Sequence, residues 1–273
     1  MNIQTLPPPL VIDKSFSQAV KSTQLSQLSK ERTLLIPYAF IYEVFTTEPK
    51  KIFTTLEGFD EFRIVDVSAL LRSESVKGEP CRSASLQPFV TDMDVLSLTW
   101  QPSPLEMDMT EQHKRESIDP LMDLWNKLIG IEPAGFTPTE LDAASGSEAE
   151  FTPLCGLLRD SERIKIIAKV MSFSHSERLD KSWFTFRFIQ TVGLHSLVMR
   201  RRYPGPLSDP SQERIEDDLQ DMEYLALGLH VGSLATNDVS PKLSKASLGW
   251  RFKLLEPKFE LVLPLHEFGP KHT

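Results

Sequence analysis

The chain of 273 residues has 38 acidic and 30 basic side chains, which gives a formal net charge of -8 at pH 7. Binding of polyanions without sequence preference depends on clustered Lys and Arg, so this charge argues against such binding as the main activity and leaves room for a local basic channel. Hydrophobic residues make up 40% of the chain and charged residues 25%, which are ordinary globular values. A disordered tail or a fibrous repeat is therefore excluded as the organising feature.

Cys81 and Cys155 are too few, and too far apart in sequence, for a disulfide framework or a Cys-rich zinc site. So few cysteines predict that the protein resides in a reducing compartment. The N-terminus lacks the basic flank and apolar run of a signal peptide, and no stretch approaches about 18 uninterrupted apolar residues. We expect a soluble, cytoplasmic protein that does not associate with a membrane.

The first third of the chain alternates strand and helix signals. A short apolar run, Leu10-Val11-Ile12, ends in Asp13 and leads directly into a helical pattern. Pro37 is expected at the first position of the next helix, where its missing N–H group needs no partner. Alternation of this kind predicts parallel strands joined by right-handed crossovers. The expected strands are 10–12, 33–36 and 62–67, and the expected helices are 15–28 and 37–46.

The middle of the chain, from residue 68 to about 210, loses the strand signals and shows apolar residues at helical spacing. Prolines such as Pro153 are expected to end or delay helices there. The small and acidic stretch 141–150 is expected to be a loop. We predict that 71–209 is a large, mostly helical insertion packed on a core formed by 1–70 and 210–273. Its expected helices are 119–129, 154–170 and 178–202.

The final third returns to alternating helices and strands. We expect helices over 212–231 and 242–248, with strands at 233–236 and 259–263. Each end of the chain has too few strands to bury a sheet alone, so the two ends are expected to complete one sheet together. The predicted fold class is α/β, with a central parallel sheet flanked by helices and interrupted by the helical insertion.

Four acidic residues are expected to meet beyond the carboxyl ends of the strands. Asp13 ends the first strand and Asp238 follows the strand at 233–236, while Glu43 and Asp221 lie on neighbouring helices. Ligands of open α/β sheets gather at this edge, where the strand order reverses. Clustered carboxylates repel one another unless cations neutralise them, and Mg²⁺ or Mn²⁺ matches such hard oxygen donors. The four acids therefore predict a site for one or two of these ions.

These residues resemble the PIN-domain nuclease family. The resemblance rests on Leu-Val-Ile-Asp-Lys-Ser at 10–15, on Ile-Pro-Tyr-Ala-Phe-Ile-Tyr-Glu at 36–43, and above all on the helix-then-strand run at 221–238 that ends in Thr-Asn-Asp. It implies a PIN-like fold, and Asp13, Glu43, Asp221 and Asp238 match the metal-binding and catalytic acids of the family. Ser15 and Thr236 match hydroxyl positions that support the first and last of them.

The resemblance implies a metal-dependent endonuclease that hydrolyses phosphodiester bonds of RNA, or of single-stranded or structured DNA, with RNA favoured. In that family such enzymes often serve as toxins, defence effectors or RNA-processing enzymes. A catalytically inactive PIN-like scaffold that binds a protein through its helical insertion is the alternative. Retention of all four acids favours the enzyme.

Two features depart from the family pattern. The segment 71–209 is much longer than in compact members, so it could gate the site, bind a protein partner or contact substrate. Asp217 and Asp218 also lie near the start of the closing helix, and either could replace Asp221 as a ligand. We prefer Asp221 because its spacing to Thr236 and Asp238 matches the family.

A basic cluster, Arg200-Arg201-Arg202, is the candidate for substrate contact. Guanidinium groups can bind phosphates, or they can pair with the carbonyl groups at a helix C-terminus, and both interpretations stay open. Motifs of serine hydrolases, phosphate-binding loops and zinc proteases are absent from the sequence. The remaining candidates have structural explanations: His175 on the surface or as a helix cap, His195 and His230 in or near the core, and Cys155 as a small buried hydrophobe.

Overall fold

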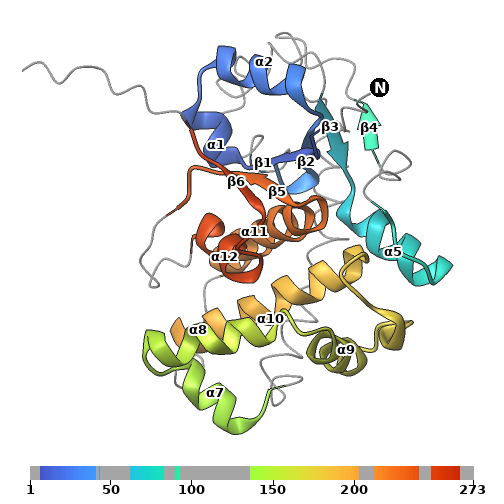
Figure 1. Ribbon diagram of the computed structural model, residues 1–273, viewed down its shortest axis with the longest axis vertical. Helices are drawn as coiled ribbons and strands as arrows, with labels where there is room; N and C mark the ends of the chain where they lie inside the picture. Colours follow the sequence, from blue (N-terminus) through green and yellow to red (C-terminus); the bar gives the residue numbers. More distant parts are fainter. Residues whose placement is uncertain are drawn as a thin grey trace, which may run out of the picture.

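The computed structural model describes residues 7–40, 43, 62–82, 90–92, 136–202, 212–239 and 247–264. These residues form a central sheet with the strand order β4-β3-β2-β1-β5-β6 (Figure 1). Five of the described strands are parallel, and β4 pairs antiparallel with β3 at one edge. The strands are β1 (Leu10–Ile12), β2 (Leu34–Pro37), β3 (Phe62–Val65), β4 (Val90–Asp92), β5 (Ser233–Ala235) and β6 (Glu260–Val262).

The strand order reverses at the middle of the sheet. β2 and β3 extend from one side of β1, and β5 and β6 extend from the other. Val11 of β1 is in register with Leu234 of β5, and Ile12 with Ala235, so the carboxyl ends of these two strands lie together. The pairing joins the two ends of the chain in one sheet, as expected from the sequence. In open α/β sheets, ligands bind beyond the carboxyl ends of the strands at such a reversal of strand order.

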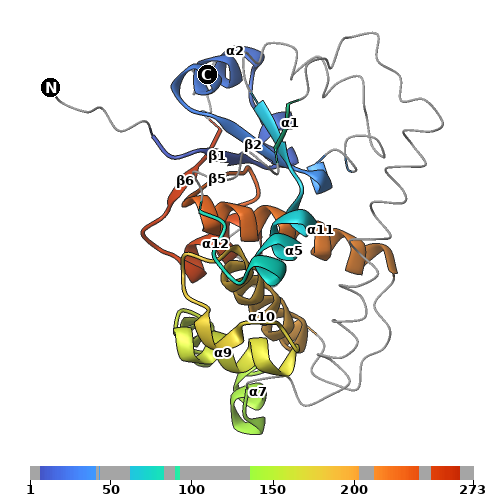
Figure 2. The ribbon, with the colours of Figure 1, turned by 90° about the vertical axis from the view of Figure 1, so that its right-hand side faces the viewer.

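Helices cover both faces of the sheet. Figures 1 and 2 show α1 (Lys14–Ala19) and α2 (Ser22–Glu31) on one face, with α11 (Gln212–Val231) and α12 (Leu248–Leu255) on the other. α11 packs against β1, β2 and β5. The predicted α/β architecture, a parallel central sheet flanked by helices, is confirmed at this level.

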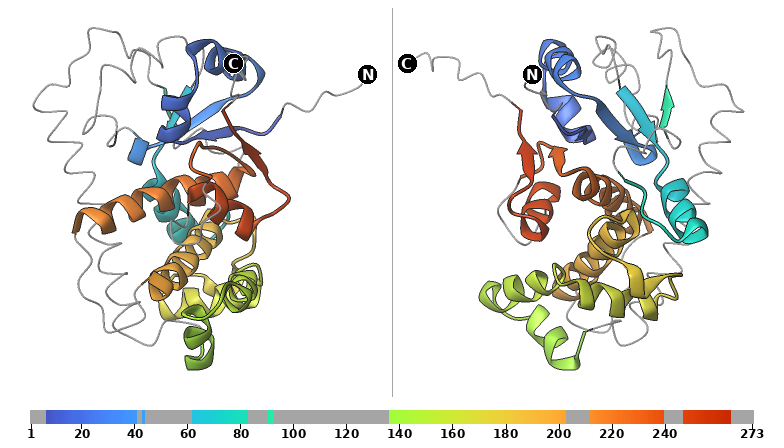
Figure 3. Two further views of the ribbon diagram at one scale, coloured as in Figure 1. Left: turned by 90° about the vertical axis from the view of Figure 1, so that its left-hand side faces the viewer. Right: turned by 45° about the vertical axis from the view of Figure 1, so that its right-hand side comes forward.

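A third layer of helices lies beyond α11, on the side away from the sheet (Figure 3). α10 (Phe184–Arg202) packs along α11, and α7 and α9 pack on α10. Phe151, Ile164, Phe184 and Leu227 belong to the same continuous cluster of buried hydrophobic residues as the strands. The other elements of this part are α5 (Val67–Lys77), α7 (Pro138–Ala144), α8 (Glu148–Leu157), α9 (Ser161–Val170) and the 3₁₀ turn η3 (Ser176–Arg178).

Several expected boundaries are wrong for local reasons. The helix expected over 15–28 is two helices, because Val20 takes an extended backbone and is buried between them. Pro37 is the last residue of β2 and pairs in register with Val65, so the helix begins at residue 38. Most of the helix expected over 242–248 lies outside the described residues, and the described helix α12 begins at Leu248, where the Ser247 side chain caps it.

The stretch 141–150 is mostly helical and not a loop. Thr137 with Glu140 and Ser147 with Glu150 form two capping boxes, so the hydroxyl and acidic residues that suggested a loop begin helices α7 and α8. Pro153 lies inside α8 and does not end it. The helix expected over 154–170 is divided between α8 and α9.

The helix expected over 178–202 begins later, at Phe184, after the turn η3. β4 was not predicted, and it falls within the segment expected to be helical. The expected helix over 119–129 lies outside the described residues. In contrast, the helix over 212–231 is confirmed from end to end, and the other predicted strands are confirmed to within two residues.

Candidate active site

Asp13 lies at the carboxyl end of β1, against the end of β5. Its side chain is buried, and its Oδ2 atom accepts hydrogen bonds from the hydroxyls of Ser15 and of Thr236, the latter at 2.7 Å. The two hydroxyl oxygens lie 3.2 Å apart. Burial raises the pKa of Asp13 above its ordinary value, these hydrogen bonds oppose the shift, and the charge of Asp238 adds to it. Ser15 thus contacts Asp13, as the resemblance implies, whereas Thr236, which was expected to support Asp238, donates its hydroxyl to Asp13 and accepts from the Asp238 backbone N–H.

Asp238 follows β5 and connects it to α12. Its backbone N–H donates to the Thr236 hydroxyl at 3.0 Å, and its Oδ2 atom accepts from the backbone N–H of Leu248 at 2.9 Å. The backbone N–H of Gly249 donates to the Asp238 carbonyl oxygen at 2.9 Å. The carboxylate is therefore held between the end of a strand and the first turn of a helix.

Glu43 is held by a residue that the sequence did not single out. The hydroxyl of Tyr224, a fully buried residue of α11, donates to Glu43 Oε2 at 2.6 Å. Burial raises the pKa of Tyr224 well above its ordinary value, and the nearby charges of Glu43 and Asp13 raise it further. Tyr224 lies three residues after Asp221, on the same face of α11, and this spacing was the signal that could have identified it.

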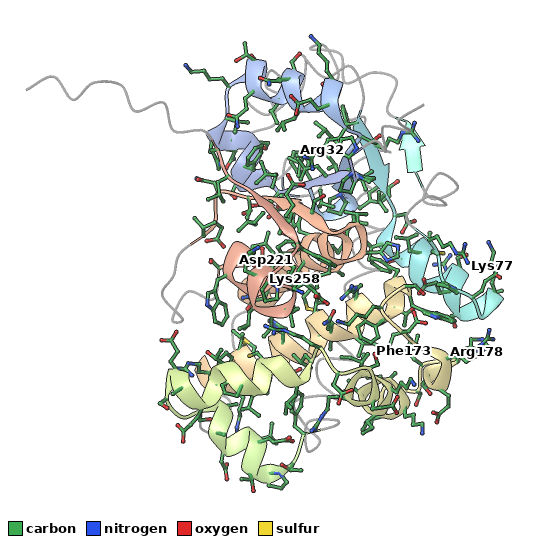
Figure 4. All side chains as sticks on the ribbon, viewed as in Figure 1. Arg32, Lys77, Phe173, Arg178, Asp221 and Lys258 are labelled. Carbon is green, nitrogen blue, oxygen red and sulfur yellow. The ribbon has the colours of Figure 1, made fainter. Side chains whose placement is uncertain are left out.

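Asp221 lies on α11 where α12 packs beside it (Figure 4). Its Oδ2 atom is 3.6 Å from a guanidinium nitrogen of Arg251, and the same guanidinium is 3.1 Å from Asp218 Oδ1. Although the Asp221 side chain is 34% exposed, loss of hydration raises its pKa well above the ordinary value. Arg251 lowers that pKa, whereas the charges of Asp13, Asp218 and Glu43 raise it. Asp221 is therefore within electrostatic range of Asp13 and Glu43 as well as of Asp218.

Glu223 is a buried acid that sequence reasoning missed. Its Oε2 atom accepts a hydrogen bond from the backbone N–H of Ala39, just beyond β2, at 3.2 Å. Burial raises the pKa of Glu223 to about 7, against the effect of this hydrogen bond, and the charges of Asp66 and Glu43 contribute to the rise. Asp66 follows β3 and caps α5. Negative charge is thus concentrated along the carboxyl edge of β1, β2, β3 and β5.

The chemistry of this edge fits a hard divalent cation. Carboxylate oxygens are the donors that Mg²⁺ and Mn²⁺ prefer, and a cation would offset the burial, and the lesser repulsion between acids, that raise the pKa values of Asp13 and Asp221. Among the described residues, however, no three His, Cys, Asp or Glu side chains come close enough together to hold a metal ion. Glu43, Asp221 and Asp238 each contact a protein donor instead.

Comparison with protein-family models, with curated proteins and with solved structures gives no match. The function therefore has to be argued from the geometry of this site. Within the described residues, no helix is long and apolar enough to cross a membrane.

The basic cluster at the end of α10 makes contacts within the protein. The Arg201 guanidinium lies 4.9 Å from the ring centroid of Phe151 and donates to the Ser147 carbonyl oxygen at 3.4 Å. The carbonyl oxygen of Arg200 accepts from Ser145. The side chain of Arg202 lies outside the described residues, as does that of Asp217. Arg201 thus packs α10 against α8.

The three histidines and Cys155 considered in the sequence lie in surroundings that fit structural roles. His175 is exposed in a left-handed conformation, and its ring contacts the Ser75 carbonyl oxygen at 3.2 Å. His195 is buried, and His230 packs edge-on against Phe184 with ring centroids 5.5 Å apart. Burial lowers the pKa of His230 to about 4 and raises that of Cys155 to about 12.

Proposed function

We propose that this chain is a PIN-like, Mg²⁺- or Mn²⁺-dependent endonuclease that hydrolyses phosphodiester bonds of RNA, or of single-stranded or structured DNA. The observation that carries the proposal is the position of Asp13 at the point where strand order reverses. There it is held by the hydroxyls of Ser15 and Thr236 and lies within the electrostatic reach of Asp221 and Asp238. RNA is the favoured substrate.

Asp13, Glu43, Asp221 and Asp238 are the residues proposed to hold the metal. Ser15 and Thr236 fix the Asp13 carboxylate, Tyr224 fixes Glu43, and the start of α12 fixes Asp238. A divalent ion would supply a water nucleophile at neutral pH and neutralise charge on the scissile phosphate. The chain then needs no side-chain nucleophile.

Substrate binding in this proposal depends on local positive charge, because the chain as a whole is acidic. Arg200, Arg201 and Arg202 remain candidates for phosphate contact. The packing of Arg201 on Phe151 favours a structural role for that residue. The segment 71–209 is the candidate for binding a protein partner.

A second candidate function is a non-catalytic scaffold with the same fold. One observation favours the scaffold: two of the proposed metal ligands already contact protein donors. Asp221 lies beside Arg251, and Glu43 accepts a hydrogen bond from Tyr224. The scaffold requires neither metal binding nor cleavage.

Replacement of Asp13 by Asn tests the choice between them. Asn keeps an oxygen that can accept from Ser15 and Thr236, so Asp13→Asn is expected to leave the fold intact, or slightly more stable, because it removes one repulsive charge. Asp238→Asn is likewise expected to leave the fold intact or slightly more stable. Both are expected to abolish Mn²⁺-dependent cleavage of a labelled single-stranded RNA, assayed beside the matching DNA.

Asp142→Asn is the matched control, since Asp142 is an exposed acid of α7. It is expected to cleave at the parental rate. Parental cleavage by both site variants would overturn the assignment of the active site. Absence of cleavage and of Mn²⁺ binding in the parent protein would favour the scaffold.

A further inference from the structure

Trp250 lies in the first turn of α12 and packs against the third layer of helices. Its indole stacks on the ring of Phe151 in α8, with ring centroids 6.3 Å apart and an angle of 15° between the two planes. Phe151 has no exposed surface, whereas Trp250 is only partly buried. The stack therefore fixes the orientation of an indole that still reaches the solvent.

The same phenyl ring holds a cation. The guanidinium of Arg201, near the end of α10, lies 4.9 Å from the ring centroid of Phe151 and donates to the Ser147 carbonyl oxygen at 3.4 Å. Arg201 is partly exposed, and because a guanidinium has five N–H donors, most of them remain available to a ligand. Within the part of the chain that the structure describes, no carboxylate forms an ion pair with Arg201. Trp250 and Arg201 thus lie close together, on a surface formed by α8, α10 and α12.

This surface adjoins the candidate site. The residue before Trp250 is Gly249, whose backbone N–H donates to the Asp238 carbonyl oxygen at 2.9 Å. The residue after it is Arg251, whose guanidinium is 3.6 Å from Asp221 Oδ2. α12 packs against both α11 and α8. A polymer bound at the carboxyl edge of the sheet would therefore meet Trp250 as it continues along α12.

An oriented indole beside a guanidinium with spare donors matches the two repeating parts of an unpaired nucleotide. The face of a base stacks on an aromatic ring whatever the base, and a guanidinium donates a pair of N–H groups to a phosphate. Bases of a duplex are stacked on one another, so their faces are not accessible to Trp250. The surface therefore favours a single strand over a duplex.

We propose that Trp250 and Arg201 bind a single strand of nucleic acid beside the candidate site, with one unpaired base stacked on Trp250 and a phosphate paired with Arg201. This inference rests on the proposed nuclease function and narrows its substrate to single-stranded RNA or DNA. Both residues bind the strand and make no contact with the reacting atoms. Phe151 acts through them, because it fixes the indole and the guanidinium in place.

Fluorescence anisotropy of labelled oligonucleotides tests the role of Trp250, with a chelator present so that the strand is not cleaved. The probes are a single-stranded RNA, the DNA of the same sequence and the RNA duplex. Trp250→Leu removes the aromatic face and is expected to weaken binding of the single strand by about fivefold or more, and Trp250→Phe by less. Binding of the duplex is expected not to change. Phe173→Leu is the matched control, since Phe173 is another partly buried aromatic residue.

Arg201→Gln provides the complementary measurement. Loss of one phosphate contact is expected to reduce the slope of log affinity against log salt concentration by about 0.7 for a single strand. Arg178→Gln, which removes an exposed cation of η3, is expected to leave that slope unchanged. Figure 4 shows both control residues, Phe173 and Arg178, away from Asp221. Should Trp250→Leu fail to fold, the salt slope of Arg201→Gln decides.

The outcomes separate this inference from the proposed function. If the stack only joins α8 to α10 and α12, the variants melt at lower temperatures and keep the parental affinity and salt slope. That result, or an equal loss of duplex binding, would overturn the inference and leave the nuclease proposal standing. Absence of single-strand binding by the parent protein would also overturn the inference, and absence of Mn²⁺-dependent cleavage as well would overturn both.

Discussion

Glu223 shows how burial changes the behaviour of a single carboxyl group at this edge of the sheet. Its pKa in the folded protein is raised to about 7, whereas an unperturbed Glu has a pKa of about 4.3. The folded state therefore binds the proton more tightly than the unfolded state does. The stability associated with this group is fully present below the ordinary pKa and is lost as the pH rises towards 7.

We expect Glu223→Gln to stabilise the protein at pH 8 and to change little at pH 4. Gln keeps an oxygen to accept from Ala39 and has no charge to bury, so the gain at pH 8 has an upper bound of about 4 kcal/mol. Urea unfolding at both pH values, with a metal chelator present, measures the difference. Glu79→Gln, which removes an exposed carboxyl group, is the control and is expected to show no such pH dependence.

Whether a residue of the site could be predicted depended on how far along the chain its partner lies. Asp13 and Asp238 could be chosen because Asp13 directly follows an apolar strand and Asp238 lies three residues after the end of another, and Ser15 and Thr236 lie within two residues of them. Arg251 gave no such signal, since its partners are 30 or more residues away on another helix. Glu223 was missed because an isolated helical acid is normally solvated.

The start of α10 illustrates the same limit for a whole helix. Glu74, which is fully buried on α5, accepts hydrogen bonds from the backbone N–H groups of Phe184 and Thr185 at 2.8 and 2.7 Å. It also accepts from the N–H of Cys81 at 2.7 Å. The backbone N–H groups at the start of α10 thus find their acceptor in a side chain 110 residues earlier in the sequence. The local sequence could therefore not locate the first residue of this helix.

Glu74→Gln is expected to destabilise the protein by about 2 kcal/mol or more. The amide NH₂ group of Gln would face backbone N–H groups, leaving buried donors without acceptors. Equilibrium urea unfolding at pH 7 measures the loss. Glu79→Gln serves again as the control, because it makes the same chemical change at an exposed site five residues away. Equal stabilities for the two variants would contradict the capping role of Glu74.

Contact between α12 and the loop that bears Asp238 can be tested at Gly249. A Cβ atom there would lie 2.9 Å from Val239 Cγ1 and 3.0 Å from the Asp238 carbonyl oxygen, so Gly249→Ala must displace the loop that bears Asp238. We expect this variant to bind Mn²⁺ more weakly and to melt at a lower temperature than the parent protein.

Gly156→Ala is the matched control for that variant. Gly156 lies in α8, and an added Cβ would meet nothing within 4 Å, so Ala is expected to stabilise the helix by about 0.5–1 kcal/mol without affecting metal binding. Calorimetric titration and thermal melting of the two Ala variants provide the comparison. Unchanged Mn²⁺ affinity in Gly249→Ala would show that the loop does not position a ligand.

Over the whole molecule, the middle of the chain is joined to the sheet by ion pairs as well as by the shared core. Arg187 of α10 is 2.8 Å from Glu256, the residue after α12, and Lys181 contacts the same carboxylate. Arg159 donates to the carbonyl oxygen of Leu254. These contacts reach the helix that bears Arg251 and the residue after it, so the third layer supports α12.

The α/β class and the meeting of the two chain ends could be predicted because apolar periodicity and strand alternation are local in sequence. β4 could not, since its pairing with β3 depends on contacts outside its own three residues. The composition of 141–150 was misleading for a related reason. Ser, Thr and Glu are as common in helix caps as in loops, and only their spacing separates the two cases.

The pairing of β1 with β5 also determines when the protein can fold. Val11 is synthesised 223 residues before its partner Leu234, so one edge of β1 stays open while most of the chain is made. Leu10, Val11 and Ile12 have no exposed surface in the folded protein, and an apolar strand with an open edge is prone to pair with other chains. A nascent chain that stops short of residue 233 should therefore depend on chaperones, and folding of the sheet should be a late event that awaits β5 and β6.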